Sequence, residues 1–85
     1  MSKIELVPYW NNDLYRLERL ITEARELEEK IKKGKNFISE VEEGEIKDFP
    51  NDQFKLIKKQ MNYMDNYLEV LKQRIEILFK SIEVW

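Results

Sequence analysis

The side chains best suited to bind an anion are seven lysines that fall in two groups along the chain. They are Lys30, Lys32, Lys33 and Lys35 in the first half, and Lys55, Lys58 and Lys59 in the second half. Ammonium groups attract phosphate, and aromatic faces and amides such as those of Tyr63 and Gln60 can stack on or hydrogen-bond to a nucleotide base. If the two groups meet in the fold, they form a candidate anion- or nucleotide-binding site made of Lys30, Lys33, Lys35, Lys58, Lys59, Gln60 and Tyr63. The alternative is a solvated face, because many of these lysines have a glutamate four residues away and the chain lacks a glycine-rich phosphate loop.

Residue types that support catalysis or metal binding are scarce. The chain has no Cys and no His, which removes the usual zinc, iron–sulfur and haem ligands and the commonest nucleophile–base pairs. Five carboxylates cluster at Glu40, Glu42, Glu43, Glu45 and Asp48, but they lack the spacing of a calcium-binding loop. We interpret them as an acidic turn, and we expect neither an enzyme, nor a cofactor, nor a metal site.

Length and charge narrow the class of protein further. With 85 residues, 42% hydrophobic and 38% charged, the chain is a single small helix-rich domain. A net charge of −2 argues against general binding to nucleic acid, which depends on neutralising phosphates. The apolar runs are too short to cross a membrane, and the first residues lack the apolar stretch of a signal peptide. We therefore expect a cytoplasmic protein.

The elements that must position these side chains follow from a heptad pattern that occurs twice. Apolar or small residues recur in steps of three and four at Leu17, Leu20, Ala24, Leu27, Ile31, Gly34, Ile38 and Val41, and again at Phe54, Ile57, Met61, Met64, Leu68, Leu71, Ile75, Leu78, Ile82 and Trp85. Gly44 and Pro50 mark a short turn between the two stripes. The pattern predicts an all-α fold, an antiparallel two-helix hairpin with helix one at about 11–43, a turn at about 44–50 and helix two at about 51–84.

Two local features qualify this hairpin. Residues 1–10 are apolar and contain Pro8, so we expect a short N-terminal arm before a helix that is capped by Asn11 or Asn12. Gly34 either ends helix one or allows the two backbones to approach closely opposite Met61. We favour the close approach, because the apolar residues after Gly34 keep the helical phase.

Helix two carries a second stripe that one antiparallel partner cannot cover. Leu56, Tyr63, Val70, Ile77 and Val84 lie seven residues apart, with Tyr67 and Arg74 beside them. If these side chains stayed in water, the protein would lose roughly 1.5 to 3 kcal/mol of stabilising free energy for each large apolar group that is not buried. We therefore expect an oligomer or partner interface at Leu56, Tyr63, Tyr67, Val70, Arg74, Ile77 and Val84. A homodimer that forms a four-helix bundle is favoured, with a larger symmetric ring or a different protein partner as alternatives.

The spacing of particular residues resembles a known family. The matching positions are Glu26, Leu27, Lys30, Ile31, Phe37, Ile38, Leu56, Ile57, Gln60, Met64, Tyr67, Leu71, Arg74 and Ile75. Over about residues 14–78 they resemble very small phage-encoded helical-hairpin proteins named after a gene product of a crAss-like phage. Gly34 departs from the pattern, in which a large aliphatic residue is usual.

The resemblance implies a phage protein in the host cytoplasm with a non-enzymatic accessory role. Our first hypothesis is an inhibitor that binds and neutralises a host protein, with an anti-defence role. The alternative is an oligomeric sponge that sequesters a linear or cyclic nucleotide signal. A structural role in virion assembly is the third hypothesis.

Overall fold

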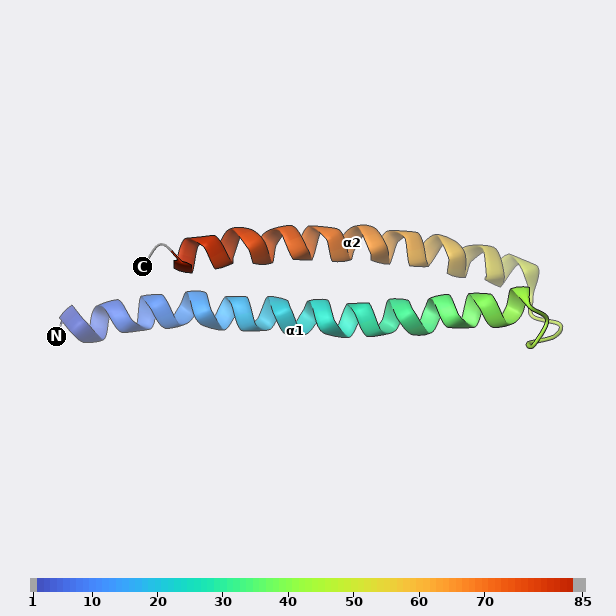
Figure 1. Cartoon of the computed structure of the whole chain (residues 1–85), viewed down its shortest axis with the longest axis horizontal. Helices are drawn as coiled ribbons and strands as arrows, with labels where there is room; N and C mark the ends of the chain where they lie inside the picture. Colours follow the sequence, from blue (N-terminus) through green and yellow to red (C-terminus); the bar gives the residue numbers. More distant parts are fainter. Residues whose placement is uncertain (1, 84–85) are drawn as a thin grey trace.

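Two antiparallel helices make up the fold. The computed structural model describes the backbone of residues 2–83 and the side chains of residues 12–82. Helix α1 spans Ser2–Glu42 and helix α2 spans Asn51–Glu83, and the two lie side by side in a rod of 66 × 17 × 16 Å (Figure 1). The described backbone contains no strand, so the predicted all-α helical hairpin is confirmed.

Helix α1 begins earlier than the sequence predicts. The backbone is helical from Ser2, so the expected extended arm over residues 1–10 and the cap at Asn11 or Asn12 are wrong. Pro8 lies beyond the first turn of α1, where proline removes the hydrogen bond to the carbonyl of Ile4 and crowds that carbonyl, yet the backbone stays helical through it. Because α1 has 41 residues and α2 has 33, α1 is longer by about 12 Å at 1.5 Å per residue, and its first turns extend past the end of α2 (Figure 1).

A glycine-dependent cap ends α1 and starts the turn at residues 43–50. Gly44 adopts a positive φ of 82°, its N–H donates to the Val41 carbonyl at 3.1 Å, and the N–H of Glu45 donates to the Glu40 carbonyl at 2.9 Å. This pair of hydrogen bonds is the Schellman motif, which satisfies carbonyl groups that the last helical turn leaves free. Helix α2 then begins after Pro50, whose carbonyl accepts the N–H of Phe54 at 3.0 Å. The turn lies where the sequence predicts it.

Three phenylalanines hold the turn against the two helices. The rings of Phe37 and Phe49 meet edge to face with centroids 5.1 Å apart, and those of Phe49 and Phe54 do so at 6.5 Å. Such pairs contribute about 0.5–1.5 kcal/mol each beyond the apolar area they bury. They fix the angle at which α2 leaves the turn, and therefore the register of the hairpin.

The core is a single seam between the helices. Leu20, Ala24, Leu27 and Ile31 of α1 are buried around Leu71 of α2, and Leu71 is 0% exposed. Met64, Leu68, Ile75 and Leu78 are partly buried against this cluster. These residues belong to the two predicted heptad stripes, so the sequence pattern identified the faces that meet.

Gly34 lies within α1 opposite the buried Met61, as the sequence predicts. A Cβ atom at Gly34 would lie 2.7 Å from Cε of Met61, well inside the sum of van der Waals radii. Glycine therefore allows the Met61 side chain to lie against the α1 backbone, and this contact compensates for the low helix propensity of glycine.

We expect Leu71→Ala to lower the free energy of unfolding by about 2–5 kcal/mol, because it leaves a cavity at the most buried position of the seam. Urea unfolding followed by circular dichroism at fixed protein concentration measures this loss. Lys72→Ala, on the exposed side of the same helix, is the control and should change stability by about 0.5 kcal/mol or less. Equal effects of the two substitutions would contradict the single-seam core.

We expect Gly34→Ala to destabilise the hairpin by about 1 kcal/mol or less, because the clash of its Cβ with the flexible end of the buried Met61 side chain is partly offset by the better helix propensity of alanine. Combining it with Met61→Ala should remove the clash, so the double-mutant cycle should show a favourable coupling of about 0.5–3 kcal/mol. A stabilising Gly34→Ala substitution would show that the backbones do not need this close approach.

Candidate functional site

The structure distributes the predicted lysine site over two sides of the hairpin. Lys35 lines a shallow groove with Lys32 and Asp65, and none of the other predicted lysines, Gln60 or Tyr63 lines that groove. Lys30 and Lys33 are exposed on α1, while Lys58, Lys59, Gln60 and Tyr63 are exposed along α2. The structure does not assemble the seven residues around one cavity, and their binding of an anion stays a prediction.

Two of these lysines pair with carboxylates across the helices. Nζ of Lys35 lies 3.2 Å from Oδ2 of Asp65, and Nζ of Lys58 lies 3.3 Å from Oε2 of Glu42. All four side chains are between 41% and 56% exposed, so each pair is worth at most about 1 kcal/mol. Both pairs connect α1 to α2 near the turn, and they neutralise charge that an anion would otherwise meet.

The other predicted contacts on α2 are also local. Lys58 lies over the ring of Phe54 at 4.9 Å from the centroid, and Lys59 lies over the ring of Tyr63 at 5.9 Å. The amide nitrogen of Gln60 lies 4.0 Å from the sulfur of Met64 in the next turn. These contacts order the exposed surface of α2 without creating a pocket there.

The predicted interface residues are exposed wherever their side chains are described. The exposed fractions are 58% for Leu56, 61% for Tyr63, 46% for Tyr67, 51% for Val70 and 70% for Ile77, and Arg74 is exposed beside them. Val84 lies outside the described residues. Helix α1 therefore leaves this stripe uncovered, as the heptad spacing predicts. The use of the stripe as an interface stays a prediction.

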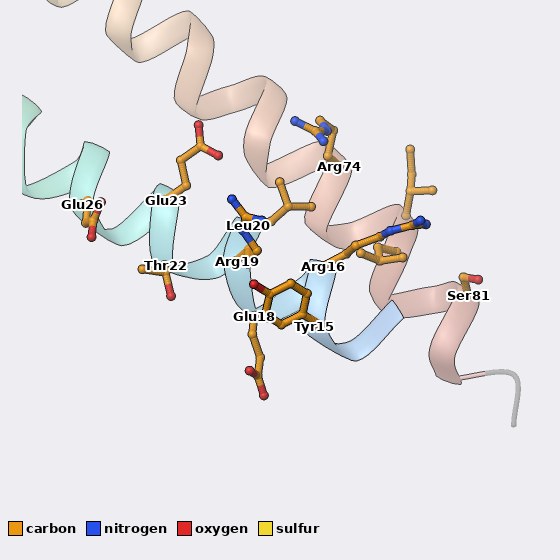
Figure 2. Close-up of a pocket in the computed structure, with 12 residues that line it drawn as sticks. Tyr15, Arg16, Glu18, Arg19, Leu20, Thr22, Glu23, Glu26, Arg74 and Ser81 are labelled. Carbon is orange, nitrogen blue, oxygen red and sulfur yellow. The ribbon is translucent and has the colours of Figure 1, made fainter. Parts of the chain in front are cut away.

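A groove that the sequence reasoning missed lies between the first half of α1 and the last third of α2 (Figure 2). It has a volume of about 1020 Å³. Its lining residues are Tyr15, Arg16, Glu18, Arg19, Leu20, Thr22, Glu23 and Glu26 from α1, and Arg74, Ile77, Leu78 and Ser81 from α2. We call it the arginine groove, because three of the four arginines of the chain line it.

The guanidinium groups of the arginine groove are exposed and largely free of carboxylate partners. Arg16 lies 3.8 Å from Asp13 in a pair whose arginine side chain is 70% exposed, and Figure 2 shows Arg16 extending from α1 toward the last turns of α2. Arg19 lies over the ring of Tyr15 at 5.6 Å from the centroid. Among residues 12–82, neither Arg19 nor Arg74 forms an ion pair. These groups keep donors that an anion can use.

Three glutamates, Glu18, Glu23 and Glu26, also line the groove and equal its three arginines in number. Glu23 accepts a hydrogen bond from the hydroxyl of Tyr67 across the helix pair. Glu18 points away from α2 (Figure 2). Leu20, Ile77 and Leu78 supply apolar surface to the groove. The groove thus combines cationic donors, an aromatic ring and an apolar wall.

The chemistry of these groups favours a flat molecule that carries phosphate. A guanidinium offers five donors in a planar fork that matches phosphate oxygens, and it holds its charge at any physiological pH. Tyr15 is 58% exposed, and with Arg19 over one face of its ring the other face is available for stacking. The sequence places Tyr15 close to Arg16 and Arg19, which is a recognisable pattern for binding a nucleotide. The lysines, which lie nearer the turn, are more numerous and therefore gave the stronger prediction of an anion site.

Metal sites and membrane-spanning helices are absent from the part of the chain that the structure describes. That part contains no group of three or more acidic, cysteine or histidine side chains placed to hold a metal ion. None of its helices combines the length and the apolar character needed to cross a membrane.

Comparison with known proteins gives one match. A family model described as Sequestin matches residues 15–77, which is most of the hairpin and includes Tyr15, Arg16, Arg19 and Arg74. No curated protein and no solved structure matches the chain. The matched segment is nearly the one that resembles the phage-encoded hairpin proteins, and a phage origin stays a prediction.

The hydrogen bond between Tyr67 and Glu23 predicts a measurable coupling between the helices. Tyr67→Phe and Glu23→Gln should each lower the free energy of unfolding by about 0.5–1.5 kcal/mol, and the double variant should lose less than the sum. Thermal unfolding of the four proteins in the cycle measures the coupling. Strict additivity would contradict the contact and would leave Glu23 as a free negative charge in the arginine groove.

Proposed function

The chain belongs to the Sequestin family, and from that membership we propose that it is a non-enzymatic binding protein that sequesters a nucleotide-like ligand. The family name itself points to sequestration. The observation that carries the choice of ligand is that Arg16, Arg19 and Arg74 line the same groove as the exposed ring of Tyr15. The ligand class is a compound with one or more phosphates and an aromatic base, of which linear and cyclic nucleotides are the common examples.

The placement of the arginines supports recognition of phosphate. Arg16 and Arg19 come from α1 and Arg74 comes from α2, so both helices supply guanidinium groups to the groove. Hydrogen bonds between charged partners are worth about 1.5–3 kcal/mol each, roughly twice the value for neutral pairs. Such contacts compensate for the openness of the groove, which leaves much of a ligand in water.

The aromatic and apolar part of the groove supports recognition of a base. Stacking of a base on an aromatic side chain is worth about 1–3 kcal/mol. Tyr15 offers such a face, and Leu20, Leu78 and Ile77 offer apolar surface nearby. A free phosphate would use only the arginines, whereas a nucleotide would use both halves of the site.

Binding without turnover agrees with the residues present. General acid–base and nucleophilic chemistry usually relies on His or Cys, and the chain has neither. The arginines of the groove donate hydrogen bonds but do not accept protons at physiological pH. A protein that only holds its ligand must be made in amounts comparable to that ligand, and a chain of 85 residues suits this requirement.

The second candidate function is stoichiometric inhibition of a host protein, within an anti-defence role in phage infection. It is favoured by the exposed stripe of Leu56, Tyr63, Tyr67, Val70 and Ile77, because contiguous apolar surface of this kind is typical of protein-binding sites. In this function the partner would cover the stripe, and the arginine groove would need no small ligand.

We expect Arg74→Glu to weaken nucleotide binding by about tenfold or more, because it replaces a charge-assisted hydrogen bond with repulsion. Isothermal titration calorimetry against linear and cyclic nucleotides measures the change. Lys72→Glu makes the same change of charge on the same helix outside the groove and should leave the affinity within about threefold of the unmodified protein.

A second pair of substitutions separates the arginine groove from the predicted lysine site. Combining Lys58→Glu with Lys59→Glu should leave nucleotide affinity close to that of the unmodified protein, because neither lysine lines the arginine groove. Loss of binding in this variant with retention in Arg74→Glu would move the site to the lysines. Failure of the unmodified protein to bind any nucleotide would contradict sequestration and favour the protein-inhibitor function.

A further inference from the structure

The exposed stripe of α2 has the spacing of a helix-packing seam. Leu56, Tyr63, Val70 and Ile77 lie seven residues apart, each more than half exposed, and Tyr67 lies beside them. A repeat of seven residues keeps one line of side chains facing a neighbouring helix over several turns, whereas a flat or irregular surface imposes no such period. The stripe therefore fits a helical partner in particular.

The extent of the stripe is compatible with a stable interface. From Leu56 to Ile77 it runs about 32 Å along the helix at 1.5 Å per residue. Five large apolar side chains, each about half exposed or more, form this patch, and an exposed apolar row of this kind can mark an interaction site. A helix packed on this patch would also cover the polar residues on its flanks, which brings the buried area toward the roughly 800 Å² per partner of a standard interface.

We infer that the partner helix is α2 of a second copy of this chain, packed antiparallel about a two-fold axis at Val70. A two-fold contact covers the stripes of both copies at once, so neither copy keeps this stripe exposed. A foreign helix would need its own matching seam. We place the two-fold axis at Val70 because of the polar residues that lie along the stripe.

The charges on the seam distinguish the antiparallel from the parallel arrangement. In a parallel pair each residue meets its own copy, which places Arg74 against the partner's Arg74 and Lys59 against the partner's Lys59, and such like charges repel. With an antiparallel axis at Val70, Arg74 lies opposite the partner's Asn66 and Lys59 lies opposite the partner's Ser81. Each cation then faces a neutral side chain that can accept a hydrogen bond.

The same axis places residues of the second copy at the arginine groove. Ile77 and Arg74 belong both to the stripe region and to the lining of the groove. The antiparallel pairing sets the partner's Tyr63 against Ile77 and the partner's Asn66 beside Arg74, so each copy adds a wall to the groove of the other. This last step rests on the proposed function, whereas the dimer itself does not.

Disulfide trapping tests the arrangement directly, because the chain contains no cysteine. Val70→Cys should form a covalent dimer rapidly under mild oxidation, since the two sulfurs meet on the axis. Tyr63→Cys and Ile77→Cys should each stay monomeric alone but link to each other when the two variants are mixed and refolded together. Phe79→Cys is the matched control, because Phe79 is 52% exposed on α2 outside the stripe, and it should not link.

Other linking patterns would overturn the proposal. A dimer of Tyr63→Cys with itself would indicate a parallel pair. Failure of Val70→Cys to link, in a protein that is helical by circular dichroism, would mean that the stripe serves another chain. Sedimentation equilibrium of the unmodified protein gives an independent check, with twice the chain mass of 10.4 kDa expected at micromolar concentration and the single mass expected for Val70→Lys.

The sedimentation experiment tests the interface and the nucleotide experiment tests the proposed function, so a negative result in one does not decide the other. A dimer that binds no nucleotide would remove the proposed function and leave the interface in place. A monomer that binds nucleotide through Arg74 would remove the interface and leave the groove as the binding site.

Discussion

A hairpin of two helices has only one seam in which to bury apolar side chains, and this constraint governs the rest of the structure. Leu71, fully buried, and the α1 residues around it fill that seam. Each helix can turn only one face toward the other, so any second apolar face must remain in water or meet another chain. Helix α2 carries such a face, while the exposed side chains described for α1, within residues 12–42, are mostly charged. The exposed stripe and the open grooves both follow from this geometry.

The two ends of the rod differ in how the helices are held together. Near the turn, the Schellman cap at Gly44, the phenylalanine cluster and two ion pairs between the helices close the hairpin. Toward the other end, arginines replace lysines between the helices and leave a groove with Tyr15 at its margin. Nearer the turn, Lys35 and Lys58 are paired with carboxylates of the other helix. The guanidinium groups at the open end keep free donors, and they carry the proposed function.

The sequence predicts the hairpin well because its signals are periodic and local. The heptad stripes identify the core, and Gly44 and Pro50 identify the turn. The start of α1 was predicted wrongly, because a single proline in the second turn disfavours a helix but does not end this one. The arginine groove was missed because it depends on register: Arg16 and Arg74 are distant in sequence, and only the antiparallel pairing brings them to one cavity. Lysine density, by contrast, is visible in sequence, but it does not show that Lys35 lines a groove with Lys32 and Asp65 that the other candidate lysines do not line.

The central claim is that this chain holds a nucleotide-like ligand without altering it. Native mass spectrometry of the purified protein with a panel of linear and cyclic nucleotides tests that claim most directly. The account predicts one member of the panel bound at a fixed ratio to the protein and recovered at its original mass after denaturation. A spectrum in which no nucleotide is retained, or in which the recovered ligand has changed mass, would contradict it.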